Sequence, residues 1–168
     1  MPRVAFYTFG ILHETLGHTR VQEFADRTPH VFASAARRDG FIGRSTNDEP
    51  WGNFWDVPRF YDPALHPPQF STPKTLTLWR DLVSVYEFSY AGLHLEALQK
   101  RKEWFMAPKW PTYVAWWVGD DELPTWGDAA RRLELLHDRG PTPEAFTFKQ
   151  PFDSEGNPTV LNLTAANL

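Results

Sequence analysis

The sequence contains no cysteine among its 168 residues. A chain without thiols forms no disulfide, has no thiolate nucleophile and binds no metal through sulfur. No apolar run approaches the ~18 residues of a membrane-spanning helix, and the opening MPRVAFYTFG lacks the apolar core of a signal peptide. These absences predict a protein that makes no membrane contact, and we expect it in the cytoplasm.

The sequence also lacks an excess of charge of one sign, since 17 Lys and Arg residues stand against 21 Asp and Glu residues. It has no block of basic residues and no RNA-binding signature, so nothing predicts an affinity for phosphate backbones. The Gly-rich phosphate loop, the dinucleotide fingerprint and the G-x-S-x-G elbow are absent as well. We therefore expect no nucleic-acid partner.

Aromatic residues are abundant: 8 Trp, 13 Phe and 5 Tyr. Such side chains either fill a core or line a cavity for an apolar ligand, and composition does not separate the two. Many of them lie in the Pro-rich segment NDEPWGNFWDVPRFYDPALHPPQFSTP, which we name the aromatic loop (residues 47–73). So much apolar surface favours burial. The loop is therefore a lid, a dimer contact or a flap over the core.

The hydrophobic pattern predicts an alternation of strands and helices. Expected strands are Arg3–Phe9, FIGRST, Thr75–Trp79 and YVAWWV, the last of these central in a sheet, with weaker signals at Trp55–Tyr61 and AFTFKQPF. Expected helices are one within 17–40 that is kinked at Pro29, one over residues 81–103, and one that starts at the N-cap Thr125 and ends before Gly140.

This order is the split βαβ pattern of a ferredoxin-like α+β domain with an antiparallel sheet. We expect a single domain over residues 1–152, followed by a weakly patterned C-terminal tail over residues 153–168. A ferredoxin-like sheet has its helices on one face, so its bare face needs a cover. Pairing two such sheets into a dimeric α/β barrel is one solution.

Four segments carry a resemblance to a known family: LWRDLVSVYEFSYAGLHLEALQKRKEWF, YVAWWV, RLELLHDRGPTPEAFTF and AFYTFG. They resemble a bacterial family catalogued as a domain of unknown function within the dimeric α/β-barrel superfamily, which also holds the antibiotic-biosynthesis monooxygenases. The first segment is more loosely similar to spheroidene monooxygenase, a carotenoid-oxidising enzyme associated with haem. The resemblance implies a ferredoxin-like fold, a homodimer and a pocket between helices and sheet, but no single activity, because the superfamily supports several reactions.

The helix expected over residues 81–103 holds the candidate catalytic residues. On a helical wheel Tyr86 shares the packing side with Leu82 and Trp104, whereas Tyr90 and His94 lie at its edge. A side chain at an edge can face a cavity, so His94 and Tyr90 are the catalytic candidates. His94 could be a haem or metal ligand, a general base acting on an acidic phenol, or a core histidine bonded to a carbonyl.

Candidates for binding a hydrophobic substrate are Trp79, Tyr86, His18, Trp104 and Trp116. Trp79 ends a strand just before the candidate helix, and His18 lies in the turn that leaves the first strand. The run HETLGH is no zinc-protease motif, because its histidines are five residues apart, about 140° round a helix, and so do not share a face.

These features predict a small enzyme with an aromatic-lined pocket. We expect a monooxygenase-like oxidation of a hydrophobic or polycyclic substrate, of the kind found in secondary metabolism, either without a cofactor or with haem bound to His94. Two alternatives stay open. One is a cofactor-free cyclase, isomerase or lyase that works by proton transfer, and the other is a protein that binds a ligand or haem without turnover.

Overall fold

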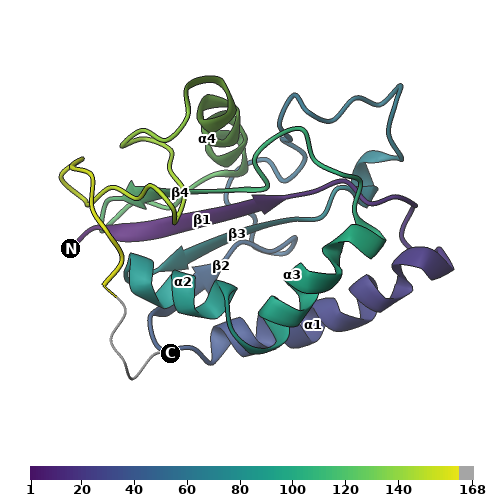
Figure 1. The fold of residues 1–168 in the computed structure, drawn as a ribbon, viewed down its shortest axis with the longest axis horizontal. Coiled ribbons are helices and arrows are strands. Elements are labelled where there is room, and N and C mark those ends of the chain that lie inside the picture. Colours follow the sequence, from purple (N-terminus) through teal and green to yellow (C-terminus); the bar gives the residue numbers. More distant parts are fainter. Residues whose placement is uncertain (163–168) are drawn as a thin grey trace.

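A computed structural model describes residues 1–162, except the side chain of Leu93, as a mixed α+β domain (Figure 1). The strands are β1 (Arg3–Phe9), β2 (Phe41–Arg44), β3 (Lys74–Trp79) and β4 (Tyr113–Val118). The helices are α1 (Gln22–Ala36), α2 (Leu82–Ser89), α3 (Gly92–Trp104) and α4 (Trp126–Arg139), with short 3-10 helices at Thr19–Val21 and Gln69–Ser71. No helix in this part of the chain could cross a membrane.

The four strands form an open antiparallel sheet in the order β2-β3-β1-β4. Strand β1 is central because its residues alternate strictly between two buried faces: Ala5, Tyr7 and Phe9 belong to one core cluster, Val4 and Phe6 to another. Strand β3 lies between β1 and β2, and β4 lies on the other side of β1. The predicted α+β class and antiparallel sheet are confirmed.

Helices cover both faces of this sheet, and the prediction of helices on one face is wrong (Figure 1). Helices α1, α2 and α3 lie on one side, and α4 lies on the other with the aromatic loop. The cause is the apolar stripe of α4, formed by Trp126, Ala129, Leu133 and Leu136, which is buried against the face that was expected to be bare. The argument from an uncovered face to a dimeric barrel therefore fails.

Strand β4 lies at the edge of the sheet rather than at its centre as predicted. Its sequence is nearly all apolar because both faces are covered, which happens at an edge as well as in the middle. The segment expected as a last strand caps this edge through an isolated bridge, in which Ala115 N and Phe146 O are 2.9 Å apart and Phe146 N and Ala115 O are 3.0 Å apart. It forms no continuous strand, and residues 55–61 contain turns and irregular segments but no strand.

The helix expected over residues 81–103 is broken into α2 and α3. Tyr90 and Ala91 leave helical geometry, and Gly92 restarts the chain at a φ of +53°, in the left-handed region that glycine tolerates. Ser89 also bonds back to the Val85 carbonyl oxygen over 2.7 Å. The break rotates α3 relative to α2, so positions four residues apart across it no longer share a face.

Two other helix predictions hold. Helix α1 continues through Pro29 as one helix, and Thr125 is the N-cap of α4, where its hydroxyl accepts a hydrogen bond from Asp128 N over 3.1 Å.

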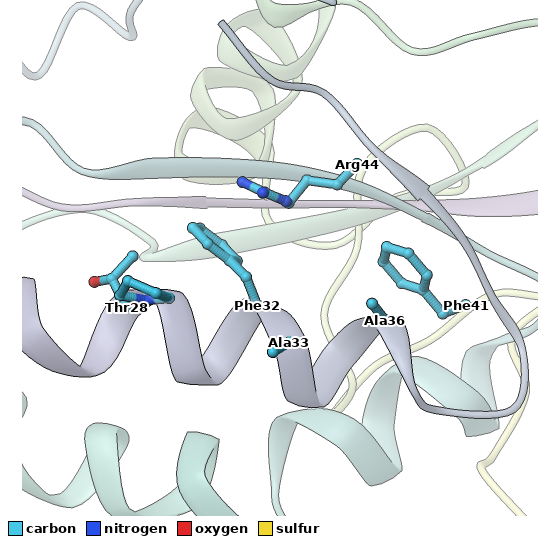
Figure 2. A pocket seen from close by; sticks show the side chains of 7 residues that line it. Thr28, Phe32, Ala33, Ala36, Phe41 and Arg44 are labelled. Atoms are coloured by element: carbon cyan, nitrogen blue, oxygen red, sulfur yellow. The ribbon is translucent and has the colours of Figure 1, made fainter.

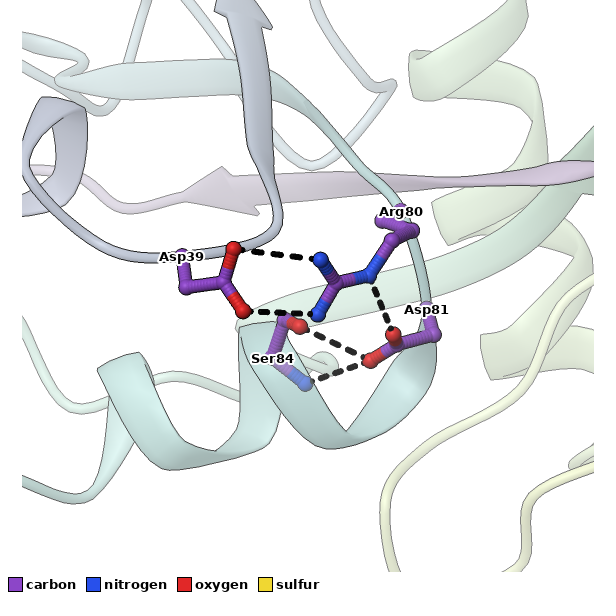
Figure 3. Close-up of polar contacts among 4 residues, drawn as sticks. All are labelled: Asp39, Arg80, Asp81 and Ser84. Atoms are coloured by element: carbon purple, nitrogen blue, oxygen red, sulfur yellow. Dashed lines mark hydrogen bonds and ion pairs between the residues drawn. The ribbon is translucent and has the colours of Figure 1, made fainter.

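A network of polar contacts holds the start of α2 in place (Figure 3). Arg80 forms two bonds of 3.1 Å to Asp39 in the turn before β2 and one of 3.0 Å to Asp81, which caps Ser84 N over 2.8 Å.

The aromatic loop packs on the α4 side of the sheet as a flap over the core. Trp51, Phe54, Val57, Phe60 and Tyr61 all contact that core cluster. Arg59 pins the loop to α4, because its guanidinium pairs with the Asp138 carboxylate and its backbone N donates to Glu134 Oε1 over 3.0 Å. One of the three predicted roles of the loop is thus confirmed.

The predicted C-terminal tail is described as far as residue 162, and residues 163–168 lie outside the described part. Phe152 and Leu161 pack against the core on the α1–α3 side. Trp117 Nε1 donates to the Phe152 carbonyl oxygen over 2.8 Å, and Thr159 N donates to the Pro151 carbonyl oxygen over 3.0 Å. The first part of this segment therefore folds back on β4.

Candidate functional site

Tyr90 and His94, the predicted catalytic pair, lie in different surroundings. Tyr90 is 41% exposed, and its ring is 4.8 Å from that of Tyr86 and 6.0 Å from that of Phe148. His94 is half-buried, with its ring 4.8 Å from Phe88. Among residues 1–162, the rings of Tyr90 and His94 share no aromatic neighbour.

His94 is held in one tautomer. Its Nδ1 is 2.6 Å from the Ser89 carbonyl oxygen, and a carbonyl only accepts, so Nδ1 carries the proton and Nε2 keeps its lone pair. Burial lowers the pKa of His94, and the bond to Ser89 offsets part of that shift. This arrangement is that of a core histidine bonded to a carbonyl, one of the three alternatives left open by the sequence.

The predicted substrate-binding residues do not line one cavity. Trp79 pairs with Val4 and Trp116 pairs with Ala5, so the two indoles point to opposite faces of the sheet. Trp104 belongs to a third cluster, with Leu12, Val21 and Phe24, and Tyr86 packs against Tyr90 and Phe148. His18 is exposed and caps the 3-10 helix Thr19–Val21, where its Nδ1 accepts from Arg20 N over 3.1 Å. These residues serve packing or capping in this fold.

A groove without any of the predicted site residues lies between α1 and the edge strand β2 (Figure 2). Its volume of about 630 Å³ is in the range of small-molecule sites. Its walls are mostly apolar. The lining residues are Thr28, Pro29, Phe32, Ala33, Ala36, Phe41 and Arg44.

Arg44 is the charged group of this groove. Its Cζ lies 3.8 Å from the centre of the Phe32 ring (Figure 2). Within residues 1–162 no carboxylate lies within ion-pair distance of this guanidinium, and it donates no side-chain hydrogen bond. Burial lowers the pKa of Arg44 from its ordinary value, although an arginine stays charged at neutral pH. Stacking on Phe32 leaves the N–H groups free for an anion.

Sequence reasoning missed Arg44 and Phe32 as site residues. Phe32 fell within the helix expected over 17–40, and Arg44 fell within the expected strand FIGRST. Each is unremarkable alone. A half-exposed phenylalanine on a helix and an arginine on the following strand become a site only when β2 packs beside α1, and that contact was not visible in the local pattern.

A family model described as "Domain of unknown function (DUF3291)" matches residues 3–162. A search among curated proteins finds no match. Two solved structures are similar to the fold. The protein of unknown function NE2512 from Nitrosomonas europaea has 12% sequence identity and a TM-score of 0.46, with 74% of this chain and 97% of that chain covered. PA3566 from Pseudomonas aeruginosa has 9% identity and a TM-score of 0.44, with the same coverage of 74% and 97%.

These comparisons confirm one part of the resemblance seen in the sequence, the membership of a family of unknown function. The placing of that family in the dimeric α/β-barrel superfamily and the similarity to spheroidene monooxygenase find no support in them.

Proposed function

The chain belongs to the DUF3291 family, whose description names no activity, and from the geometry we propose that it binds a hydrophobic small molecule with an acidic group in the groove between α1 and β2. One observation carries the proposal. Arg44 stacks on Phe32 beside an apolar groove and has no anionic partner of its own within residues 1–162. A ligand that supplies the anion pairs this charge, while its apolar body covers the groove.

The two halves of such a ligand contribute differently. The apolar body gains about 25 cal/mol for each Å² removed from water, whatever its shape. The acidic group gains a charge-assisted hydrogen bond, on the order of 1.5–3 kcal/mol, and fixes the orientation of the ligand. We therefore expect selectivity for amphipathic acids over neutral compounds of the same shape.

Two fluorescent probes test this proposal. 8-Anilinonaphthalene-1-sulfonate carries an anion, and N-phenyl-1-naphthylamine has the same aromatic body without it. We expect Arg44→Gln to weaken binding of the sulfonate about tenfold and to leave the neutral amine unchanged. Phe32→Ala should weaken both. Arg139→Gln, at the exposed end of α4, is the matched control. Equal binding of the sulfonate to the wild type and Arg44→Gln contradicts the proposal.

A second candidate function is the monooxygenase-like oxidation, with proton transfer at His94. The observation in its favour is the tautomer of His94, because the bond from Nδ1 to Ser89 leaves Nε2 as a base, and burial favours its neutral form. In this proposal Nε2 takes the proton of an acidic phenol, and O₂ is the oxidant. An isomerase, cyclase or lyase needs only the proton transfer.

An oxygen electrode separates these outcomes with a polycyclic phenol such as 9-phenanthrol. Oxygen uptake that is lost in His94→Gln and kept in Tyr90→Phe supports His94 as the base, and loss in both supports the predicted pair. Uptake that is the same in the wild type and in both variants rejects the pair.

Haem does not fit the surroundings of His94. The His94 ring packs on the Phe88 ring, with 4.8 Å between their centres. Neither the groove between α1 and β2 nor the smaller groove between α1 and α3 includes His94. We propose no haem-dependent step. The homodimer implied by the resemblance stays a prediction, and light scattering of the full chain tests it.

A further inference from the structure

The groove between α1 and β2 offers a ligand few polar contacts. Most of its lining side chains have no polar atom: those of Pro29, Phe32, Ala33, Ala36 and Phe41. The hydroxyl of Thr28 donates to the Phe24 carbonyl oxygen over 2.8 Å, so its proton is engaged within α1. Arg44 has no carboxylate partner within residues 1–162. Arg44 is thus the lining side chain that can donate hydrogen bonds to a ligand, and the rest of the groove is apolar.

The guanidinium of Arg44 is held in a defined plane. Its Cζ lies 3.8 Å from the centre of the Phe32 ring, a distance at which the planar group lies against the face of the ring (Figure 2). Its N–H groups then point outward in the plane of the guanidinium. Two N–H groups on one edge of a guanidinium form a fork that matches the two oxygens of a carboxylate. This geometry favours a planar acidic group.

Two alanines keep the middle of the groove open. Ala33 and Ala36 are exposed and lie on α1 between the side chains of Phe32 and Phe41 (Figure 2). An alanine side chain ends at Cβ, so the body of a ligand can lie against the helix where a larger side chain would fill the space. From Thr28 to Ala36 the helix rises about 12 Å, which is comparable with the length of two fused rings that carry one acidic group.

We propose that the ligand of this groove is an apolar monocarboxylate, such as a two-ring aromatic acid. Its carboxylate forms two parallel hydrogen bonds with Arg44, and its body lies over Ala33 and Ala36 against Phe41. A second charged group at the far end of the body would meet apolar side chains, so the groove selects against dicarboxylates. This inference rests on the proposed function, because it names the class of acid that the same groove accepts.

Isothermal titration calorimetry of the full chain at pH 7 compares three ligands with one naphthalene body: 2-naphthoate, naphthalene-2-sulfonate and naphthalene-2,6-dicarboxylate. We expect 2-naphthoate to bind about fivefold more tightly than the sulfonate, whose oxygens are weaker acceptors and do not lie in one plane with the ring carbon. The dicarboxylate should bind about tenfold more weakly than 2-naphthoate, because its second charge has no partner. A sulfonate or a dicarboxylate that binds as tightly as 2-naphthoate overturns the inference.

Two variants test the parts of the groove separately, and circular dichroism checks that each is folded. Arg44→Lys keeps the charge but has no planar fork, so the preference for 2-naphthoate over the sulfonate should disappear. It should stay in Arg139→Lys, at the exposed end of α4. Ala33→Leu should weaken 2-naphthoate about tenfold, because leucine takes the place of the ligand body. Ala107→Leu, at an exposed alanine outside the groove, should leave it unchanged. A preference that survives in Arg44→Lys, or full affinity in Ala33→Leu, overturns the inference.

The same titrations distinguish a failure of this inference from a failure of the proposed function. If the sulfonate binds as tightly as 2-naphthoate and both lose affinity in Arg44→Gln, the groove binds hydrophobic acids and only the choice of a carboxylate is wrong. If neither acid binds, or if both bind Arg44→Gln as tightly as the wild type, the proposed function fails and this inference fails with it.

Discussion

His94 closes the break between two helices by donating from Nδ1 to the carbonyl oxygen of Ser89, 2.6 Å away. Ser89 is the last residue of α2, and His94 lies in the first turn of α3. The carbonyl groups at the end of a helix have no partner within the helix, and a side chain that satisfies one of them fixes where the helix stops. The imidazole thereby fixes the geometry of the α2–α3 junction.

Replacing His94 with alanine should lower the free energy of unfolding at pH 7 by about 1–3 kcal/mol, because the Ser89 carbonyl loses its partner. Urea unfolding measures this change. His30→Ala, an exposed position on α1, is the control and should cost little.

The same bond predicts a pH dependence. The pKa of folded His94 lies below its ordinary value of about 6.5, so below that pH the unfolded chain binds the proton more readily. The contribution of neutral His94 to the free energy of unfolding is fully present above about pH 6.5. It is lost as the pH falls through the pKa of His94 in the folded protein. The stability difference between the wild type and His94→Ala should therefore shrink from pH 7 to pH 5. A difference that stays constant contradicts a buried neutral imidazole.

The elements were predictable where a local signal decides them. The alternation in β1, the N-cap Thr125 and the stripe of α4 each depend on residues within a few positions. The break at Tyr90 also depends on how α2 packs on β3 and α3 packs on α1, and Ser89 and Gly92 were its local signs. The face covered by α4 was missed because an amphipathic stripe says that a helix is buried but not against which face.

The candidate site was less predictable than the fold. The wheel that placed Tyr90 and His94 at one edge assumed an unbroken helix, and the break removed that relation. Arg44 and Phe32 meet only through tertiary packing. In each case the residue types were visible, but the contacts that make them a site join segments far apart in the sequence.

Gly40→Ala should be one of the most destabilising glycine substitutions. Gly40 has a φ of +88°, and an added Cβ would lie 2.1 Å from Ser84 Oγ and 2.5 Å from Ser84 Cβ. Both backbone strain and overlap therefore apply, and we expect a loss of about 2 kcal/mol or more. Gly140→Ala is the matched control, with a φ of +72° and no atom within 4 Å of the new Cβ. Equal losses in thermal unfolding would show that the overlap with Ser84 relaxes freely.

The two carboxylates around Arg80 should differ in their contribution to stability. Asp81 caps both Ser84 N and Ser84 Oγ over 2.8 Å, so Asp81→Ala should cost about 1 kcal/mol. The Asp39 side chain is 89% exposed, and an exposed ion pair contributes little, so Asp39→Ala should lower the free energy of unfolding much less than Asp81→Ala. Chemical denaturation at low and high salt checks both. A larger cost at Asp39 than at Asp81 would mean that the pair with Arg80, not the cap, holds the start of α2.

Because of Lys74, the free energy of unfolding should increase with pH above pH 7. Burial lowers the pKa of Lys74 to about 8 in the folded protein, whereas an unfolded lysine keeps its proton to about pH 10.4. Between these values the unfolded chain binds more protons than the folded one, so the free energy of unfolding increases as the pH rises. The rise should be clearest from pH 7.5 to 9.5. Above that range Tyr7 begins to ionise in the unfolded chain but not in the folded protein, so the free energy of unfolding falls again.

Lys74→Met removes the titrating group, and Lys74→Arg keeps a charge that does not titrate in this range, so the rise should disappear in both variants. Urea unfolding across this range measures the slope. If it persists unchanged in both variants, another group is responsible and the ammonium of Lys74 is as well solvated in the folded protein as in the unfolded chain.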